Sequence, residues 1–180
     1  MGLSKAVNEL HSKRLALRPL HAQDATQRYL DWFDDGETRR FIISARHRQT
    51  IDSLRDFIEA NRNSDRSLLL GIFDREEHLH IGNIKFDPVD SISGRAILGI
   101  LIGDIRWRNR GVFPEAFDTS ASWLFGNFGI SQFWLGVDTL NLSATRSYAR
   151  AGFSEMPPPE DLFGLAKPGA RYMCRDFRQG

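Results

Sequence analysis

Apolar residues recur along the chain at two spacings, and these spacings predict strands and helices. Alternation of apolar with small or polar positions from Leu15 onward predicts a first strand that ends at Pro19. The continuous apolar run over residues 68–73 is typical of a buried strand. The same criteria predict further strands over residues 80–86, 96–102, 132–137 and 171–177. Asp87-Pro88 is expected to end the strand before it, and residues 89–94 to form a loop.

Segments with a helical repeat separate these strands. Thr50 is a good N-cap for a helix that continues to about residue 61. Pro114 suits the first turn of a helix over residues 114–125, because its missing N–H would have no partner there. Gly152 marks the end of a helix over residues 144–151. The remaining predictions are a helix over residues 22–33, a short helix or turn over 37–43 and a loop over 163–169.

The elements follow one another in the order β-α-α-β-β-β-α-β-α-β, without internal repeats. Antiparallel hairpins followed by a strand–helix–strand unit indicate an α/β (α+β) domain in which a mixed sheet has helices on both faces. A chain of 180 residues is long enough for one compact domain with a sizeable core. We expect a single domain over residues 15–180 and a flexible N-terminal arm over residues 1–14.

Composition and charge exclude several classes of protein. The net charge is +1, so the chain lacks the basic field of a nucleic-acid-binding protein, and we expect neither nucleic acid nor membrane as a partner. Cys174 is the single cysteine, which excludes an internal disulfide and a multi-cysteine metal site, and we expect no metal. Residues 1–13 lack the apolar stretch of a signal peptide, and no apolar run reaches transmembrane length. The expected location is the cytoplasm.

The stretch over residues 107–117 has the features of an anion-binding turn. It follows the apolar run 96–102 and leads into a predicted helix. The first N–H groups of a helix have no partner within the helix, and the helix dipole adds partial positive charge there. Arg108 and Arg110 add formal charge beside Gly111. The predicted ligand is a phosphate or pyrophosphate that belongs to a larger molecule.

Two motifs occur in this half of the chain. The turn reads Arg108-Asn109-Arg110-Gly111-Val112-Phe113, and some 30 residues later a second motif has Asn141, Ala144, Tyr148, Gly152 and Phe153. They resemble the patterns Gln/Arg-x-x-Gly-x-Gly/Ala and Asn-x-x-Ala-x-x-x-Tyr-x-x-x-Gly-Phe of the GNAT acyltransferases, which use acetyl-CoA. Residues 97–104 are similar to the ribosomal-protein-alanine and nucleotide-sugar acetyltransferase branch of that family. The resemblance covers residues 15–177, and two motifs in this order are together specific.

The resemblance implies a GNAT-like, mostly antiparallel sheet and acetyl-CoA as cosubstrate. The pantetheine arm would lie against the strand at Ile100 and Ile102. The pyrophosphate would bind at the turn, which makes the candidate contacts Arg108, Arg110, Gly111, Val112 and Phe113. Tyr148 would protonate the departing CoA thiolate, and Asn141 would hydrogen-bond the CoA arm or an ordered water. Tyr148 and Asn141 are therefore the candidate catalytic residues.

The implied reaction is direct acetyl transfer to a primary amine. The amine attacks the thioester carbonyl, an oxyanion forms, and a thiolate leaves. Backbone N–H groups on a splayed strand can stabilise that oxyanion, and losing one such donor typically costs ~100-fold in rate. A tyrosine suits the acid role because a phenol carries its proton at neutral pH.

The chain departs from the family pattern at two positions. Phe113 replaces the second glycine of the turn, so its N–H remains available only if its backbone is helical and its ring turns toward the core. The position before Gly99, often a glutamate base in the related branch, holds Leu98. The base is then a water relay or another residue, and the candidates are Asp104, Asp138, His80 and Asp87. These departures leave open a CoA-binding module without catalysis or a plain protein-interaction domain.

The acceptor is predicted to be a small-molecule amine. The basic residues Arg39, Arg40, Arg46, His47 and Arg48 favour an amino-sugar nucleotide over a protein N-terminus, unless they form only a solvated loop. Trp32, with Phe33 and Phe41, either packs in the core or lines an acceptor cleft. Cys174 is expected to be an inert core residue, and the protein to be a monomer or a homodimer.

Overall fold

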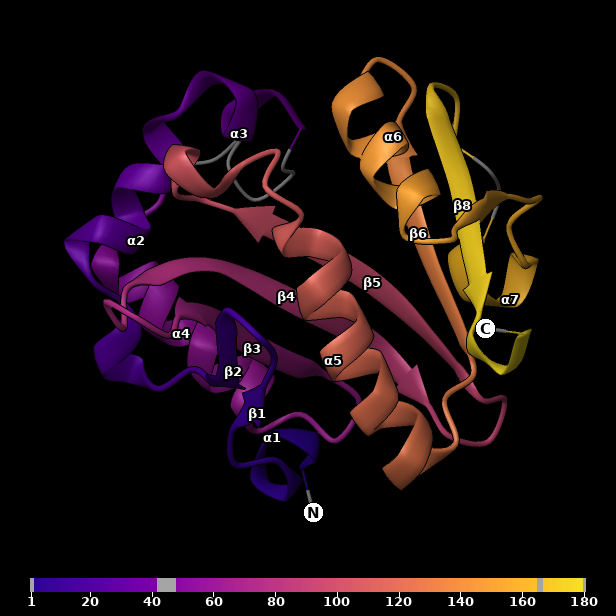
Figure 1. The fold of residues 1–180 in the computed structure, drawn as a ribbon, viewed down its shortest axis with the longest axis horizontal. Helices are drawn as coiled ribbons and strands as arrows, with labels where there is room; N and C mark the ends of the chain where they lie inside the picture. The colour runs from indigo at the N-terminus through magenta and orange to yellow at the C-terminus, as the bar shows by residue number, and fades with distance from the viewer. Residues whose placement is uncertain (1, 42–47, 165–166, 180) are drawn as a thin grey trace.

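The computed structural model describes residues 2–41, 48–164 and 167–179, and it confirms the expected α/β (α+β) fold (Figure 1). In this part of the chain, an eight-stranded sheet has the order β1-β2-β3-β4-β5-β6-β8-β7. Its strands are β1 (Leu10–His11), β2 (Leu15–Pro19), β3 (Leu68–Asp74), β4 (His80–Asp90), β5 (Arg95–Ile102), β6 (Gln132–Asp138), β7 (Ser154–Glu155) and β8 (Ala170–Asp176). Neighbours pair antiparallel, except β5 and β6, which pair parallel.

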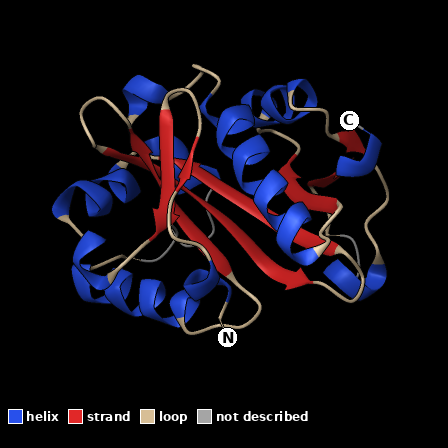
Figure 2. Ribbon diagram, turned by 60° about the horizontal axis from the view of Figure 1, so that its bottom comes forward, coloured by secondary structure: helices blue, strands red, loops and turns tan. Residues whose placement is uncertain are grey.

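Helices cover both faces of this sheet, as expected (Figure 2). The α-helices are α1 (Leu3–Ala6), α2 (Gln27–Asp31), α3 (Gly36–Phe41), α4 (Ile51–Arg62), α5 (Val112–Phe128), α6 (Leu142–Arg150) and α7 (Glu160–Phe163). Short 3₁₀ turns are η1 (Ala22–Asp24), η2 (Trp32–Asp34), η4 (Ile105–Trp107) and η5 (Phe177–Gln179). Thr50 caps α4 as predicted, because its side chain accepts a hydrogen bond from the N–H of Ser53.

Apolar side chains form one core on each face of the sheet. On one face, α5 and the start of the chain pack on the sheet, with Phe117, Phe86 and Phe133 fully buried. On the other face, α2 and α4 enclose a second core that includes Tyr29 and Ile58. Strands that are buried on both faces carry apolar residues at successive positions, which explains the continuous run that marked β3 in the sequence.

The N-terminal segment packs on the domain, which differs from the expected flexible arm over residues 1–14. Leu3 and Val7 are buried in the core beneath α5, and β1 extends the edge of the sheet. Glu115 in the first turn of α5 accepts hydrogen bonds from the Ser12 hydroxyl at 2.7 Å and from the Arg14 backbone N–H at 2.8 Å. These contacts could not be predicted from the sequence, because they join positions about a hundred residues apart.

Several predicted boundaries shift in the structure. Strand β4 does not stop at Asp87-Pro88 but continues to Asp90 after an irregularity in its pairing with β5. The helix expected over residues 22–33 is divided among η1, α2 and η2. Helix α5 begins at Val112, two residues before Pro114, so the predicted anion turn includes the first helical residues. Part of the expected short helix over 37–43 and of the loop over 163–169 lies outside the described residues.

The parallel pair β5 and β6 separates partway along its length. Its register runs from Arg95 opposite Gln132 to Ile97 opposite Trp134, and no further pairing follows. Strand β5 continues to Ile102 and β6 to Asp138, and Figure 1 shows the two strands diverging toward the start of α5. The second half of β5 therefore has a strand partner on its β4 side and none on its β6 side.

Candidate active site

The predicted anion turn presents free backbone donors at the start of α5. Gly111 is the N-cap of the helix and has a left-handed conformation with φ of 72°, which a glycine adopts without strain. Among the described residues, the N–H groups of Arg110, Gly111, Val112 and Phe113 donate no backbone hydrogen bond. The dipole of the 17-residue helix α5 adds partial positive charge at this end. The turn is thus suited to bind an anion through its backbone.

Phe113 leaves this turn open. Its backbone is helical, its side chain is 5 % exposed, and its ring packs among Phe117, Tyr148 and Phe153. The ring points into the core, so it does not cover the N–H groups of the turn. The helical backbone and the inward ring are the two conditions under which the N–H of Phe113 remains available in place of the second glycine.

The two arginines of the turn have different surroundings. Arg108 lies inward, where its guanidinium donates to the Ile102 carbonyl at 3.0 Å and pairs with Asp35 at 3.0 Å and Glu37 at 3.3 Å. It joins the end of β5 to α3, and its positive charge is already paired with carboxylates. Arg110 is exposed and has no hydrogen bond or ion pair among the described residues. The geometry supports Arg110 as a phosphate contact and Arg108 as a residue that positions the turn.

The open edge of β5 carries unpaired backbone groups. Gly103 donates its N–H to the Ile81 carbonyl at 3.0 Å, so residues 101 and 99 face β4 in the antiparallel ladder. Ile100 and Ile102, between and after them, present their backbone groups toward the side that β6 has left. The Ile102 carbonyl accepts from Arg108, whereas the N–H and C=O of Ile100 have no strand partner. An extended chain such as a pantetheine arm can pair with this edge.

Helix α6 places the two candidate catalytic side chains. Asn141 caps the helix, with its Oδ1 accepting from the Ala144 N–H at 3.1 Å, which leaves its Nδ2 free to donate. The Tyr148 ring stands edge-on to Phe113, with 4.9 Å between ring centroids. Among the described residues, no hydrogen-bond partner is found for its hydroxyl, and the Tyr148 side chain as a whole is only partly buried. Burial of the ring raises the pKa of Tyr148 to about 12, so the phenol keeps its proton at neutral pH.

The anion turn, the open edge of β5 and Tyr148 thus lie around one end of the diverging strands. Residues 14–154 match the family model described as acetyltransferase (GNAT) domain. The chain belongs to the GNAT acetyltransferase family. The domain is therefore an acetyltransferase, and the resemblance seen in the two motifs is confirmed at family level. No curated protein matches the chain in sequence.

Solved structures show the same fold at low sequence identity. A GNAT acetyltransferase from Bacillus anthracis is 14 % identical, with a TM-score of 0.76 over 94 % of this chain and 99 % of that one. A ribosomal L7/L12 α-N-protein acetyltransferase in complex with coenzyme A is 12 % identical, with a TM-score of 0.77 over 94 % and 97 %. The microcin C7 self-immunity acetyltransferase, in complex with acetyl-CoA and AMP, is 14 % identical, with a TM-score of 0.75 over 92 % and 93 %. These matches do not assign the chain to a branch of the family.

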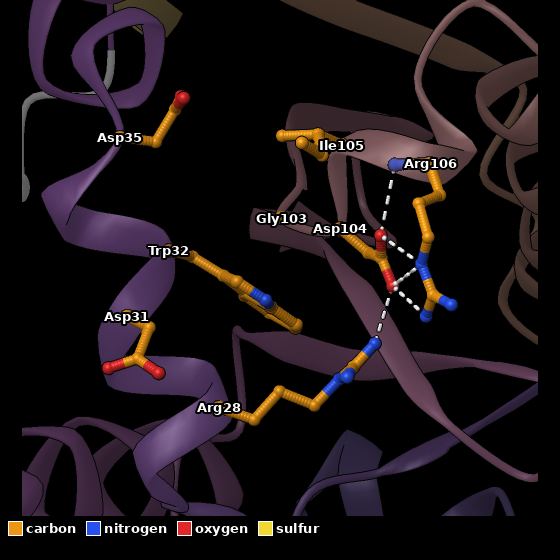
Figure 3. Close-up of a pocket in the computed structure, with 8 residues that line it drawn as sticks. All are labelled: Arg28, Asp31, Trp32, Asp35, Gly103, Asp104, Ile105 and Arg106. Atoms are coloured by element: carbon orange, nitrogen blue, oxygen red, sulfur yellow. Dashed lines mark hydrogen bonds and ion pairs between the residues drawn. The ribbon is translucent and has the colours of Figure 1, made fainter.

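Two cavities flank the aromatic residues that follow α2. The charged cavity, of about 520 Å³, is lined by Arg28, Asp31, Trp32, Asp35, Gly103, Asp104, Ile105 and Arg106 (Figure 3). The apolar cavity, of about 440 Å³, is lined by Tyr29, Phe33, Gln49, Leu54, Phe57, Leu69, Asn83, Lys85, Gly99, Ile100 and Leu101. Trp32 is 5 % exposed and packs in the core, as one of its two expectations had it, and it also lines the charged cavity.

The four candidate bases do not line the apolar cavity. Asp104 is held between Arg106 at 2.8 Å and Arg28 at 2.5 Å (Figure 3), and the hydrogen bonds from Arg106 lower its pKa. Asp87 pairs with Lys85, and Asp138 accepts from the Leu140 N–H. Burial lowers the pKa of His80 to about 4, so this imidazole is neutral at pH 7. None of the four is therefore a base within the apolar cavity.

Leu98 lies on the other face of the sheet from the apolar cavity. Its side chain is 5 % exposed and belongs to the core beneath α5. The neighbours Gly99 and Leu101 face the cavity instead, because successive side chains on a strand alternate between faces. A carboxylate at position 98 would therefore be buried away from the cavity. The loss of glutamate there does not change what lines it.

Other sequence predictions concern the basic cluster, Cys174, metal ligands and membrane-spanning helices. Of the basic cluster, Arg46 and His47 lie outside the described residues, and Arg39 pairs with Asp34 at 2.5 Å. Cys174 is buried and burial raises its pKa to about 12, as expected of an unreactive thiol. The described residues contain no cluster of three or more potential metal ligands. In the same part of the chain, no helix combines the length and apolar character needed to span a bilayer.

Proposed function

We propose that the protein transfers an acetyl group from acetyl-CoA directly to a primary amine. The observation that carries this proposal is the contact between Phe113 in the first turn of α5 and Tyr148 on α6. This contact joins the free N–H groups of an anion turn to a phenol without a partner. The structures that hold coenzyme A or acetyl-CoA in the same fold support this choice of donor.

The residues of the turn and of β5 would hold the donor. The N–H groups of Arg110 to Phe113 would bind the pyrophosphate, with Arg110 supplying a formal positive charge. The backbone of Ile100 and the N–H of Ile102 would bind the pantetheine arm, and Asn141 would donate from Nδ2 to that arm or to a water. Acetyl-CoA supplies an activated thioester carbonyl when bound.

Tyr148 would act as the general acid. When the amine nitrogen bonds to the carbonyl carbon, the carbon–sulfur bond breaks and the electron pair leaves on sulfur. Tyr148 holds a proton on Oη and can give it to that sulfur. The amine must lose a proton as well, and none of the described residues that line the apolar cavity is a carboxylate or an imidazole. That proton passes to water in this proposal.

Replacing Tyr148 by Phe tests the assignment. The ring contacts with Phe113 and Phe153 are kept, so the fold and coenzyme A binding should be unchanged. The turnover of acetyl-CoA with an amine, measured as the release of free thiol, should fall about 100-fold. An unchanged turnover would remove Tyr148 from the acid role.

Calorimetric titration with coenzyme A tests the binding half of the proposal. Arg110→Ala should weaken coenzyme A binding, whereas Arg108→Ala should mainly lower the stability of the fold. Full affinity in the Arg110 variant would place the phosphates elsewhere. Binding of coenzyme A without thiol release for any amine would favour the alternative of a CoA-binding module that lacks catalysis.

The acceptor was expected to be an amino-sugar nucleotide, with a protein N-terminus as the alternative. The single described cation that lines the apolar cavity is Lys85, whose ammonium pairs with Asp87 at 2.9 Å. A diphosphate would need more positive charge than this residue offers. The described residues therefore give no support to the nucleotide, and the cavity itself points to a different class of acceptor.

A further inference from the structure

We infer that the apolar cavity binds the acceptor, and that this acceptor is a primary amine on an apolar body with a neutral hydrogen-bond-accepting group such as an amide carbonyl. This inference rests on the proposed function, because it names the substrate of the same acetyl transfer. The apolar cavity has a volume of about 440 Å³, which falls within the usual range for small-molecule sites.

The cavity adjoins the edge proposed for the donor. Gly99, Ile100 and Leu101 of β5 line it, and Ile100 carries the backbone groups that β6 leaves unpaired. An amine seated in the cavity therefore lies against the same strand as the proposed pantetheine arm. This arrangement brings the two reactants to one strand from different sides, which favours transfer through proximity.

The walls of the cavity select an apolar body. Its described lining consists mainly of aromatic and aliphatic side chains from α2, η2, α4 and the sheet, such as Phe33, Leu54 and Leu69. Gly99 contributes no side chain, and a Cβ built there would have no atom within 4 Å. The missing side chain thus leaves space in the middle of the sheet, where a larger residue would otherwise fill the cavity.

Asn83 provides the polar contact. It is 6 % exposed, and its Oδ1 lies 2.8 Å from Nε2 of His80. Its Nδ2 is completely buried and has no hydrogen-bond partner in the described structure. A buried donor without a partner is unfavourable, and an acceptor atom on a ligand removes that cost. Asn83 is therefore the candidate specificity-determining residue.

The charge of the lining excludes other amines. No carboxylate is present among the described residues that line the cavity, so the second ammonium of a polyamine would lack a partner and would meet Lys85. Tyr29 is 2 % exposed and, because burial raises its pKa, it is a neutral phenol. Asn83 and Tyr29 are thus both neutral, which suits an uncharged polar group on the acceptor.

Acetylation assays with matched amines test this inference. Phenylalanine amide has the amine, the apolar ring and a carbonyl, whereas phenethylamine lacks the carbonyl, and spermidine lacks the apolar body. The ratio kcat/KM should be highest for phenylalanine amide and about tenfold lower for phenethylamine, as expected for one lost hydrogen bond. A short peptide beginning with phenylalanine distinguishes a protein N-terminus from a free small molecule as the source of this chemistry.

Two variants locate the binding site. Asn83→Leu should raise KM for phenylalanine amide about tenfold and leave KM for phenethylamine unchanged, whereas a general loss of structure would affect both. Gly99→Leu should fill the cavity and raise KM for both amines, without changing the affinity for coenzyme A. Gly126→Leu is the matched control, because a Cβ there also meets no atom within 4 Å but lies on the exposed side of α5.

The outcomes separate this inference from the proposed function. Preference for spermidine, or an unchanged KM in Gly99→Leu, would overturn the inference and leave the acetyltransferase proposal standing. Calorimetric binding of phenylalanine amide that Gly99→Leu abolishes, without thiol release from acetyl-CoA, would support the cavity and contradict the proposed reaction. Equal kcat/KM for phenylalanine amide and phenethylamine would overturn the role of Asn83.

Discussion

The charged cavity and the apolar cavity are both lined by the segment that contains α2 and η2, but they differ in how their polar groups are satisfied. Trp32 lines the first, and Tyr29 and Phe33 from the same segment line the second. In the charged cavity, Asp104 binds Arg28 and Arg106, and Figure 3 shows this carboxylate between the two guanidinium groups. In the apolar cavity, the Asn83 amide nitrogen has no hydrogen-bond partner within the part of the chain that the structure describes.

This difference leads us to expect a ligand in the apolar cavity rather than in the charged one. Asp35 in the charged cavity accepts from the N–H and hydroxyl of Thr38 and pairs with Arg108, and Asp31 accepts from Gln27. Each carboxylate therefore has a partner within the chain, and a ligand would have to displace it. A single unpaired donor in an apolar wall has no such competitor, so a ligand gains the full hydrogen bond.

The largest expected effect comes from a side chain added at Gly103, beside Trp32 in the charged cavity. A Cβ on Gly103 would lie 1.9 Å from Cδ2 of Trp32, so Gly103→Ala must displace the indole ring. Overpacking of this kind should lower the free energy of unfolding by about 3 kcal/mol, measured by urea denaturation. The control Gly126→Ala, at an open helical position, should be neutral or slightly stabilising. Equal stability of the two variants would show that Trp32 has room to move.

An acid-sensitive loss of stability should come from His80, which stacks on Phe73 and contacts Trp32 and Tyr29. Burial lowers its folded pKa from 6.5 to about 4, so the unfolded chain binds the proton more tightly. Stability from this group is present above pH 6.5 and is lost as the pH falls toward 4. Between pH 7 and pH 5, the loss should be about 2 kcal/mol.

Thermal or urea unfolding of His80→Gln at both pH values measures this contribution. A glutamine does not titrate, so the variant should lose less stability than the wild type between pH 7 and pH 5. Its side chain can still donate to Oδ1 of Asn83, which keeps that contact as a control. The same pH dependence in both proteins would contradict a neutral, buried His80.

The smallest effect is expected in the charged cavity. Asp31 is exposed and accepts one hydrogen bond from Gln27 at 2.7 Å. Asp31→Asn should change stability by less than about 0.5 kcal/mol and leave KM for the acceptor amine unchanged. Steady-state kinetics beside Asn83→Leu make the comparison direct. A raised KM in the Asp31 variant would place the acceptor, or its entry path, at the charged cavity.

Local pattern predicted the elements that surround the site. The alternation and the helical stripes predicted the central strands and α4, α5 and α6, because burial of one face imposes a period on the sequence. The Gly111 turn and the Tyr148 motif were also readable, since both depend on local backbone geometry. Errors came at Asp87-Pro88 and at the N-terminal segment, where pairing and packing with distant residues override local signals.

The roles of individual side chains depended on which face or neighbour each one meets. Two arginines at positions 108 and 110 are equivalent in sequence, yet one pairs with carboxylates of α3 and its surroundings while the other is exposed. Leu98 stands where related proteins often have a glutamate base, although its side chain belongs to the core on the other face of the sheet from the apolar cavity. The burial of Asn83 and its unpaired amide nitrogen could not be predicted from the sequence, because both depend on which residues surround it in the fold.

The sequence by itself determined the family, the order of the central strands and helices and the position of the predicted anion turn, since these follow from contiguous patterns of residue type. Only the tertiary structure decided that Phe113 turns inward, that Arg108 is engaged and that an apolar cavity lies against β5. The physical reason is that hydrogen-bond satisfaction and cavity shape depend on residues far apart in the chain. Local sequence patterns do not show which of these residues the fold brings together.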